Sequence, residues 1–134
     1  MSEKTSVLIV DDEISVADAL EMILGDNGYD VTVALTGREA LSKIDAQQFD
    51  ITITDLRLPD ISGLDILSRI REKGSSCLVI VITAHKTPEV VLESKCRGAY
   101  EVLSKPFFPS DVLKLISSGL NRQIRSGTDN AGRE

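Results

Sequence analysis

The sequence predicts an α/β domain in which a doubly wound parallel sheet carries helices on both faces. Five short apolar segments alternate with five segments of helical periodicity along the 134 residues. Three of the apolar segments are almost continuously hydrophobic, as expected of parallel strands covered on both faces. Repeated strand–helix units favour right-handed crossovers, which distribute the helices over an open sheet. The expected strands are residues 7–10, 31–34, 51–54, 78–82 and 100–103.

The expected helices have recognisable starts or ends. The first helical pattern closes at Gly28, and the second follows Thr36 and Glu39, which have the spacing of a capping box. Before the fourth, Thr87 is suited to the N-cap and Pro88 to the first helical position. The five helices are expected to begin near residues 14, 37, 63, 88 and 109.

The composition fits one soluble domain with a buried core. Apolar residues make up 42% of the chain and charged residues 27%, with a formal net charge of −6. An acidic chain gives no electrostatic reason for direct binding of nucleic acid. No apolar run reaches the roughly 18 residues of a membrane span, and residues 1–5 lack the apolar core of a signal peptide. We therefore expect a cytoplasmic protein that does not bind membranes.

The end of the chain differs from the rest. After residue 121 the apolar content falls and serine, glycine, asparagine and aspartate become frequent. Such a composition is typical of linkers and disordered segments. We expect a domain over residues 1–121 and a disordered polar tail or linker over residues 122–134.

Polar side chains follow four of the five expected strands. Asp11 and Asp12 come after the first strand, Asp55 after the third, Thr83 after the fourth and Lys105 after the fifth. Because parallel strands end at the same edge of a sheet, we expect these side chains to converge. Clustered carboxylates repel one another, and Mg²⁺, which prefers oxygen ligands, relieves that repulsion. With an ammonium and a hydroxyl beside it, this cluster suits phosphoryl transfer to a carboxylate.

These residues lie in stretches that resemble the receiver domain of two-component response regulators. The resemblance extends over roughly residues 6–120, and its matching stretches are Val7–Glu13, Asp55–Leu64, Thr83–Ala84 and Lys105–Phe107. It implies a flavodoxin-like (βα)₅ fold with strand order 2-1-3-4-5. It also implies a signalling domain that catalyses only its own phosphorylation and dephosphorylation, and therefore not an enzyme in the usual sense.

The resemblance implies a phosphoacceptor and a set of metal ligands. Asp55 is the expected phosphoacceptor, which takes a phosphoryl group from the phosphohistidine of a sensor kinase. Asp12 is the expected direct Mg²⁺ ligand, and Asp11 binds beside it, directly or through water. Asp55 itself and the backbone carbonyl of Arg57 are expected to complete the protein's share of the coordination.

The resemblance also implies a conformational switch, but with one departure from the family pattern. Thr83 is the expected switch hydroxyl, and Lys105 is expected to pair with the phosphoryl group. The family usually has an aromatic residue three positions before this lysine, whereas this chain has Val102. Tyr100 is expected to pack elsewhere. We therefore expect a muted or differently wired output change.

Two polar residues are expected to tune the lifetime of the phosphoryl group. Arg57 lies two residues after Asp55, and His85 lies two residues after Thr83. Both positions are expected to flank the path of the hydrolytic water. The hypothesis is that their bulk shields the acyl phosphate and slows its loss.

The partners implied are a sensor histidine kinase or phosphotransfer protein, and an output domain or effector protein. A phosphorylation-linked homodimer is open at this stage, as is whether an effector follows in a longer protein. A pseudo-receiver that binds partners without phosphorylation is the main alternative. A phosphatase with an aspartyl nucleophile is a second, although such enzymes have another aspartate two residues after the nucleophile, where this chain has Glu13 after Asp11.

Overall fold

The computed structural model describes residues 4–132, with side chains through residue 123. The strands form one parallel sheet in the order β2-β1-β3-β4-β5. This topology confirms the predicted fold and strand order. The strands are β1 (Ser6–Val10), β2 (Asp30–Ala34), β3 (Ile51–Asp55), β4 (Leu78–Thr83) and β5 (Glu101–Ser104).

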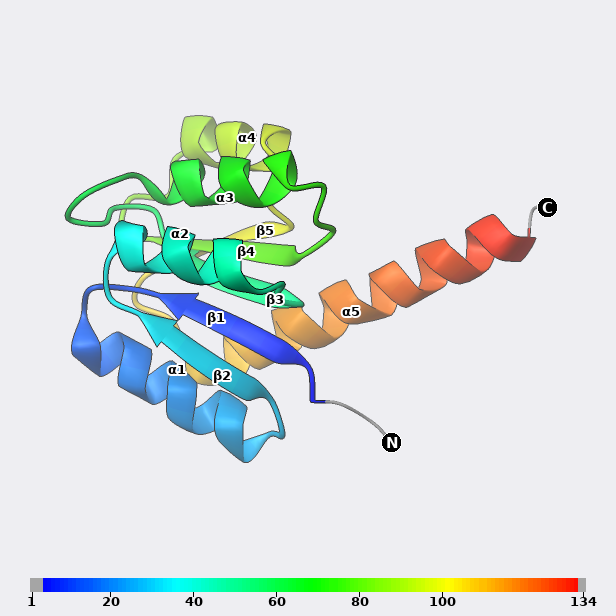
Figure 1. Cartoon of the computed structure of the whole chain (residues 1–134), viewed down its shortest axis with the longest axis horizontal. Helices are drawn as coiled ribbons and strands as arrows, with labels where there is room; N and C mark the ends of the chain where they lie inside the picture. Colours follow the sequence, from blue (N-terminus) through cyan, green and yellow to red (C-terminus); the bar gives the residue numbers. More distant parts are fainter. Residues whose placement is uncertain (1–3, 133–134) are drawn as a thin grey trace.

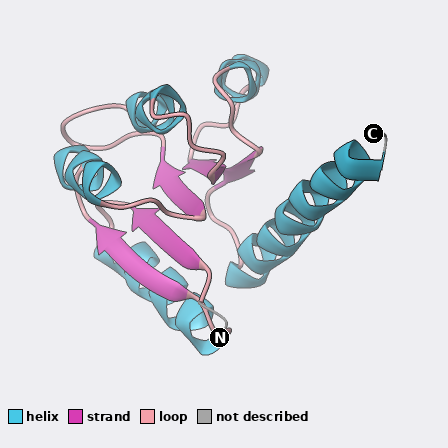
Figure 2. Ribbon diagram, turned by 45° about the vertical axis from the view of Figure 1, so that its right-hand side comes forward, coloured by secondary structure: helices cyan, strands magenta, loops and turns pink. Residues whose placement is uncertain are grey.

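Helices cover both faces of the sheet. Helices α1 and α5 pack on one face, and α2, α3 and α4 pack on the other (Figures 1 and 2). This arrangement is the one that right-handed crossovers produce. The helices are α1 (Ile14–Asp26), α2 (Gly37–Ala46), α3 (Gly63–Glu72), α4 (Pro88–Cys96) and α5 (Pro109–Gly132).

The alternation of side chains along each strand builds two cores. In β1, Leu8 and Val10 point into the core under α2 and α3, whereas Val7 and Ile9 point into the core under α1 and α5. Successive side chains of a strand point to opposite faces, so a strand covered on both sides has to be apolar throughout. Every residue of β3 and β4 is buried. The near-continuous apolar runs in the sequence reflect this double coverage.

Both predicted threonine caps are present, but the capping box predicted at Thr36 lacks its return hydrogen bond from Glu39. The Oγ1 atom of Thr87 accepts a hydrogen bond from the Val90 N–H at 3.1 Å, and that of Thr36 accepts one from the Glu39 N–H at 3.1 Å. The Glu39 carboxylate does not return to Thr36 as in a capping box. It accepts from the N–H of Leu35 at 2.8 Å instead. Both helices therefore begin where the sequence predicts.

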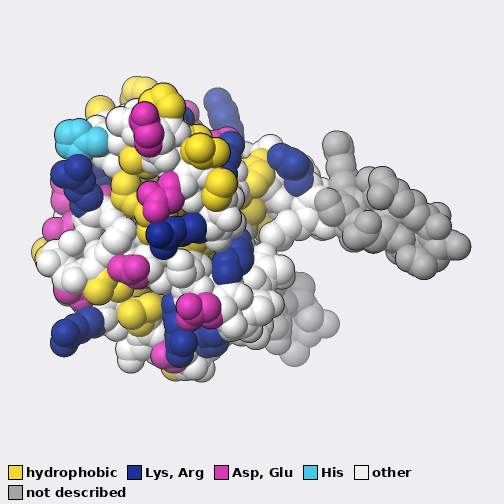
Figure 3. All heavy atoms as spheres, turned by 90° about the horizontal axis from the view of Figure 1, so that it is seen from above, with side chains coloured by type: hydrophobic (Ala, Val, Ile, Leu, Met, Phe, Trp, Pro, Cys, Tyr) yellow, Lys and Arg dark blue, Asp and Glu magenta, His cyan; other side chains and the backbone are white. Residues whose placement is uncertain are grey.

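Charged side chains of both signs are interspersed on the face formed by α2, α3 and α4 (Figure 3). Arg69 of α3 lies 2.9 Å from Asp45 of α2, and Arg97 donates to Ser68 of α3 at 3.2 Å. The Arg69–Asp45 pair is exposed, and exposed pairs contribute at most about 1 kcal/mol. Side-chain contacts on this surface thus join neighbouring helices without carrying much of the stability.

The backbone of α5 continues as helix to Gly132 and extends beyond the sheet (Figure 1). The helix therefore runs through most of the segment for which we expected a polar tail, whereas residues 133–134 lie outside the described part of the chain. The domain boundary after residue 121 stays a prediction. Within the described residues, none of the helices combines the length and apolarity needed to cross a membrane.

Candidate functional site

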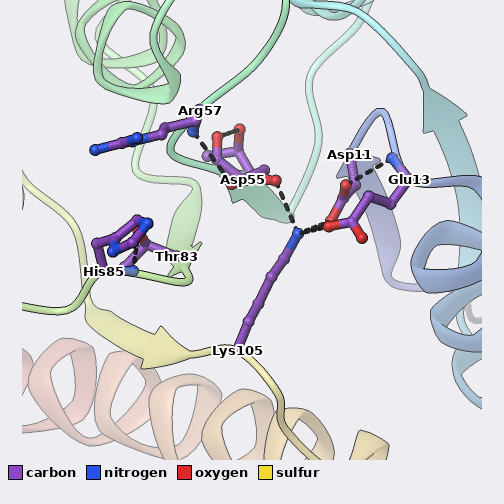
Figure 4. A network of polar contacts seen from close by, with 8 residues as sticks. Asp11, Glu13, Asp55, Arg57, Thr83, His85 and Lys105 are labelled. Carbon is purple, nitrogen blue, oxygen red and sulfur yellow. Dashed lines mark hydrogen bonds and ion pairs between the residues drawn. The ribbon is translucent and has the colours of Figure 1, made fainter.

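The four strand ends that carry polar residues meet at one edge of the sheet (Figure 4). Asp55 and Thr83 are the last residues of the adjacent strands β3 and β4. Asp11 follows β1 directly, and Lys105 follows β5 directly. Parallel strands in register bring these positions together, as the sequence predicts.

Three carboxylates form an acidic cluster, defined as Asp11, Asp12 and Asp55. One oxygen atom from each lies within 4.8 Å of the others. The side chains of Asp11 and Asp55 are buried, whereas Asp12 is exposed. Two negative charges are thus held largely away from water, and this is costly unless a cation faces them.

Lys105 provides that positive charge. Its Nζ atom lies 2.8 Å from Asp55 Oδ2, 3.0 Å from Asp11 Oδ2 and 2.5 Å from Glu13 Oε1. Partial burial alone lowers the pKa of Lys105, but its contacts with Asp55, Glu13 and Asp11 outweigh burial and raise the pKa above its ordinary value. Lys105 is therefore a permanent ammonium at the centre of the site.

Asp11 has features that suit a metal ligand. Burial raises its pKa, although the N–H of Glu13 and the ammonium of Lys105 act in the opposite direction. Its Oδ1 accepts from the Glu13 N–H at 2.9 Å, whereas its buried Oδ2 accepts no hydrogen bond within the described chain and only pairs with the charge of Lys105. A buried carboxylate oxygen normally has hydrogen-bond partners or a metal ion. The all-oxygen cluster fits a hard divalent cation.

Both oxygens of Asp55 have polar partners. Oδ2 faces Lys105, and Oδ1 accepts a hydrogen bond from the backbone N–H of Arg57 at 3.1 Å. The carboxylate is therefore held in one orientation at the carboxyl end of the sheet. A side chain that is fixed in this way needs little reorganisation before it binds or reacts.

The loop after β3 returns against Asp55 at Gly63. A Cβ atom at Gly63 would lie 2.2 Å from the backbone oxygen of Asp55, so the close approach requires glycine. Next to it, Ser62 Oγ accepts from the Leu64 N–H at 3.1 Å, and Asp65 Oδ2 accepts from the Ser62 N–H at 3.2 Å. This capping box was not predicted from the sequence, although the Ser-x-x-Asp spacing signals it.

Thr83 lies at the site without contacting Asp55 through a hydrogen bond. Its buried Oγ1 accepts from the backbone N–H of His85 at 3.1 Å, and its carbonyl accepts from the Lys105 N–H at 2.8 Å. Thr83 therefore connects the loop after β4 to the loop after β5. Its hydroxyl proton has no acceptor fixed by these contacts.

Arg57 and His85 contact Asp55 and Thr83, respectively, through their backbone N–H groups. Both side chains are exposed, and Figure 4 shows the Arg57 side chain extending away from Asp55. Only the backbone N–H of Arg57 contacts the Asp55 carboxylate through a hydrogen bond. Glu13, by contrast, has no role in the sequence analysis, yet it contacts Lys105. Its position as a third acidic residue after β1 was the available signal.

Val102 of β5 and Tyr100, which directly precedes β5, pack on opposite faces of the sheet. Val102 is almost fully buried in the core under α2 and α3. Tyr100 packs against α5, where the Arg122 guanidinium lies 5.8 Å from the centre of its ring and Gly119 leaves room for it. The expectation that Tyr100 packs away from the site is therefore confirmed.

Comparisons with known proteins agree with this geometry. The sequence pattern of the response regulator receiver domain matches residues 7–117. Regulatory protein VanR of Enterococcus faecium is 36% identical over 122 residues, which cover 91% of this chain and 52% of VanR. The chain thus spans about half the length of such curated relatives.

Solved structures show the same likeness. A CheY-like receiver domain protein of Methanospirillum hungatei has a TM-score of 0.87 at 31% identity, covering 92% of this chain and 99% of that one. The chemotaxis protein CheY4 of Vibrio cholerae has a TM-score of 0.82 at 34% identity, covering 87% and 98%. Together with the convergent strand ends, these matches show that the chain belongs to the response regulator receiver domain family.

Proposed function

We propose that this receiver domain accepts a phosphoryl group on Asp55 in a Mg²⁺-dependent reaction and thereby controls an output domain or effector protein. The main observation in support of the proposal is that both oxygens of the Asp55 carboxylate have a partner. Lys105 contacts one oxygen, and the Arg57 N–H donates to the other. A sensor histidine kinase or a phosphotransfer protein would supply the phosphoryl group. A cytoplasmic location and a phosphorylation-linked homodimer belong to the same proposal.

The reaction proposed is a displacement at phosphorus. An oxygen of Asp55 attacks the phosphorus of a phosphohistidine, an O–P bond forms, the N–P bond breaks, and the imidazole nitrogen retains the electron pair of that bond. Mg²⁺, held by the acidic cluster and the Arg57 carbonyl, would neutralise the negative charge of the carboxylates and the phosphoryl oxygens. Lys105 is positioned to pair with the phosphoryl group, because it already faces Asp55.

Thr83 is proposed to couple phosphorylation of Asp55 to a change between two receiver conformations. Its Oγ1 accepts from the His85 N–H, so the hydroxyl can donate its own proton to a phosphoryl oxygen on Asp55. Donation in that direction would pull on the loop after β4 and shift the population of two receiver conformations. The position that usually has a mobile aromatic side chain in this family is the buried Val102 in this chain. We therefore propose that this chain transmits the conformational change to its output by a different route.

The experiment that tests the proposed chemistry is intact mass measurement after incubation with acetyl phosphate. The protein should gain one phosphoryl group with Mg²⁺ present, and should gain none after chelation or in Asp55→Asn. A gain that persists in Asp55→Asn would place the phosphoryl group elsewhere. No gain in the parent protein, with acetyl phosphate or a cognate kinase, would favour the phosphorylation-independent pseudo-receiver, which the convergence of the site residues argues against.

Arg57 and His85 are proposed to slow the loss of the phosphoryl group. Both side chains are exposed on the loops that follow Asp55 and Thr83, where they can obstruct an approaching water molecule. The double variant Arg57→Ala, His85→Ala should lose its phosphoryl group several-fold faster than the parent. Lys114→Ala, which removes an exposed cation on α5, is the control. Equal rates in all three proteins would remove this proposal.

A further inference from the structure

A carboxylate outside the acidic cluster connects the loop after β3 to a helix. Asp60 Oδ1 accepts from the backbone N–H of Gly37 at 2.9 Å, and Asp60 Oδ2 accepts from that of Arg38 at 2.9 Å. Gly37 and Arg38 are the first two residues of α2, whose N–H groups have no partner within the helix. These hydrogen bonds lower the pKa of Asp60, with that to Arg38 the stronger cause. Asp60 is therefore an anion held at a helix N-terminus.

A packing contact reinforces the same connection. A Cβ atom at Gly37 would lie 2.2 Å from Cγ1 of Ile61 and 3.0 Å from Oδ1 of Asp60. A side chain at this position would have to displace the Ile61 side chain, so glycine allows the loop to lie this close to the start of α2. The tip of the loop thus has a polar and an apolar contact with α2, although 23 residues separate Asp60 from Gly37 in the sequence.

The base of the same loop forms part of the proposed phosphoacceptor site. The Arg57 N–H donates to Asp55 Oδ1, and Arg57 pairs with Ser62 in an antiparallel bridge. The Gly63 N–H donates to the Leu56 carbonyl at 2.8 Å. Residues 56–62 therefore form a closed loop whose base orients Asp55 and whose tip is attached to α2.

We infer that Asp60 is a positioning residue for the phosphoacceptor site, because it ties the loop of residues 56–62 to the N-terminus of α2. The inference rests on the proposed function, since the group positioned is the Arg57 backbone, which orients Asp55 and would ligate Mg²⁺. Without the contacts at its tip, the loop samples more conformations. In these conformations the Arg57 backbone is no longer held in line with Asp55. Asp60 does not touch the reacting atoms and acts only through the loop.

The test measures Mg²⁺ affinity of the unphosphorylated protein by isothermal titration calorimetry. Asp60→Ala should weaken Mg²⁺ binding about tenfold, the lower end of what outer partners of metal ligands contribute. Hydrogen exchange at the Arg57 amide should also become faster. Asp60→Asn retains the side-chain shape and one acceptor oxygen, so its Mg²⁺ affinity should fall between those of Asp60→Ala and the parent. This variant replaces Asp60→Ala in the test if the alanine variant does not fold.

The matched control is Thr36→Ala, which removes the N-cap of the same helix without touching the loop. It should lower Tm as the Asp60 variants do, but leave both Mg²⁺ affinity and Arg57 exchange at parental values. Parental Mg²⁺ affinity in Asp60→Ala and Asp60→Asn would overturn the inference, as would an equal loss in Thr36→Ala. A parent protein that binds no Mg²⁺ would instead count against the proposed function itself, so the two failures are distinguishable.

Discussion

Substitution of Gly63 by alanine should damage both the fold and the phosphoacceptor site. The new Cβ atom would lie 2.2 Å from the Asp55 carbonyl oxygen and 3.0 Å from the Leu56 Cα, and both neighbours are backbone atoms that cannot rotate away. Ordinary contacts begin near 3.4 Å, so α3 or the end of β3 has to move by about 1.2 Å. The residue contacted at the end of β3 is the proposed phosphoacceptor, and β3 is fully buried.

Two magnitudes follow from that displacement. Overpacking of this kind costs roughly 1–3 kcal/mol of unfolding free energy. A misplacement of about 1 Å at a reacting group costs up to roughly 100-fold in rate. Urea unfolding measures the first quantity, and the rate of Mg²⁺-dependent phosphorylation by acetyl phosphate, followed by intact mass, measures the second.

The control for this prediction is Gly25→Ala. Gly25 lies in α1, and a Cβ atom there would meet nothing within 4 Å. This variant should be as stable as the parent or up to about 1 kcal/mol more stable, because alanine has a higher helix propensity than glycine. If Gly63→Ala unfolds and reacts like Gly25→Ala, the argument that the close approach at Asp55 requires glycine is wrong.

Two further predictions concern metal and pH. Added Mg²⁺ should raise the stability of the parent by about 1.4 kcal/mol at ten times its Kd, and thermal unfolding of Asp11→Asn should show little of this increase. Burial raises the pKa of the Cys77 thiol to about 11 from 9.0, so the folded state retains a proton that the unfolded state loses first. The unfolding free energy should therefore be intact below pH 9 and fall by roughly 2–3 kcal/mol as the pH rises to 11. Denaturant titrations of Cys77→Ala should lack this part of the decline, and an identical decline would contradict the burial argument.

Local patterns in the sequence predicted the sheet and the convergence of the site. Strands such as β4 are covered on both faces, so their apolar runs are unbroken, and the polar residue after each run marks the sheet edge. The contacts of Asp60 with α2 join residues far apart in the chain, and no local pattern encodes them. The sequence does not signal the helical backbone of residues 122–132, because a polar segment has no apolar stripe to indicate a helix.

The position of Lys105 was predicted, but its contacts were predicted only in part. A lysine after the fifth strand is expected to face the carboxylates, but its contact with Glu13, the N-cap residue of α1, depends on how the loop after β1 lies against the loop after β5. Similarly, the sequence places His85 near the site, whereas the contact with Thr83 is made by its backbone N–H and not by its ring. Such details depend on loop conformation, which residue type and spacing alone do not determine.

The most direct test of the central claim is to locate the phosphoryl group within the chain. After phosphorylation with acetyl phosphate and Mg²⁺, borohydride reduces an aspartyl phosphate to homoserine, and peptide sequencing by mass spectrometry identifies the converted residue. We expect homoserine at position 55 alone, and only when Mg²⁺ was present. Conversion at Asp11 or Asp12, or an unmodified position 55 in protein that has gained a phosphoryl group, would contradict it.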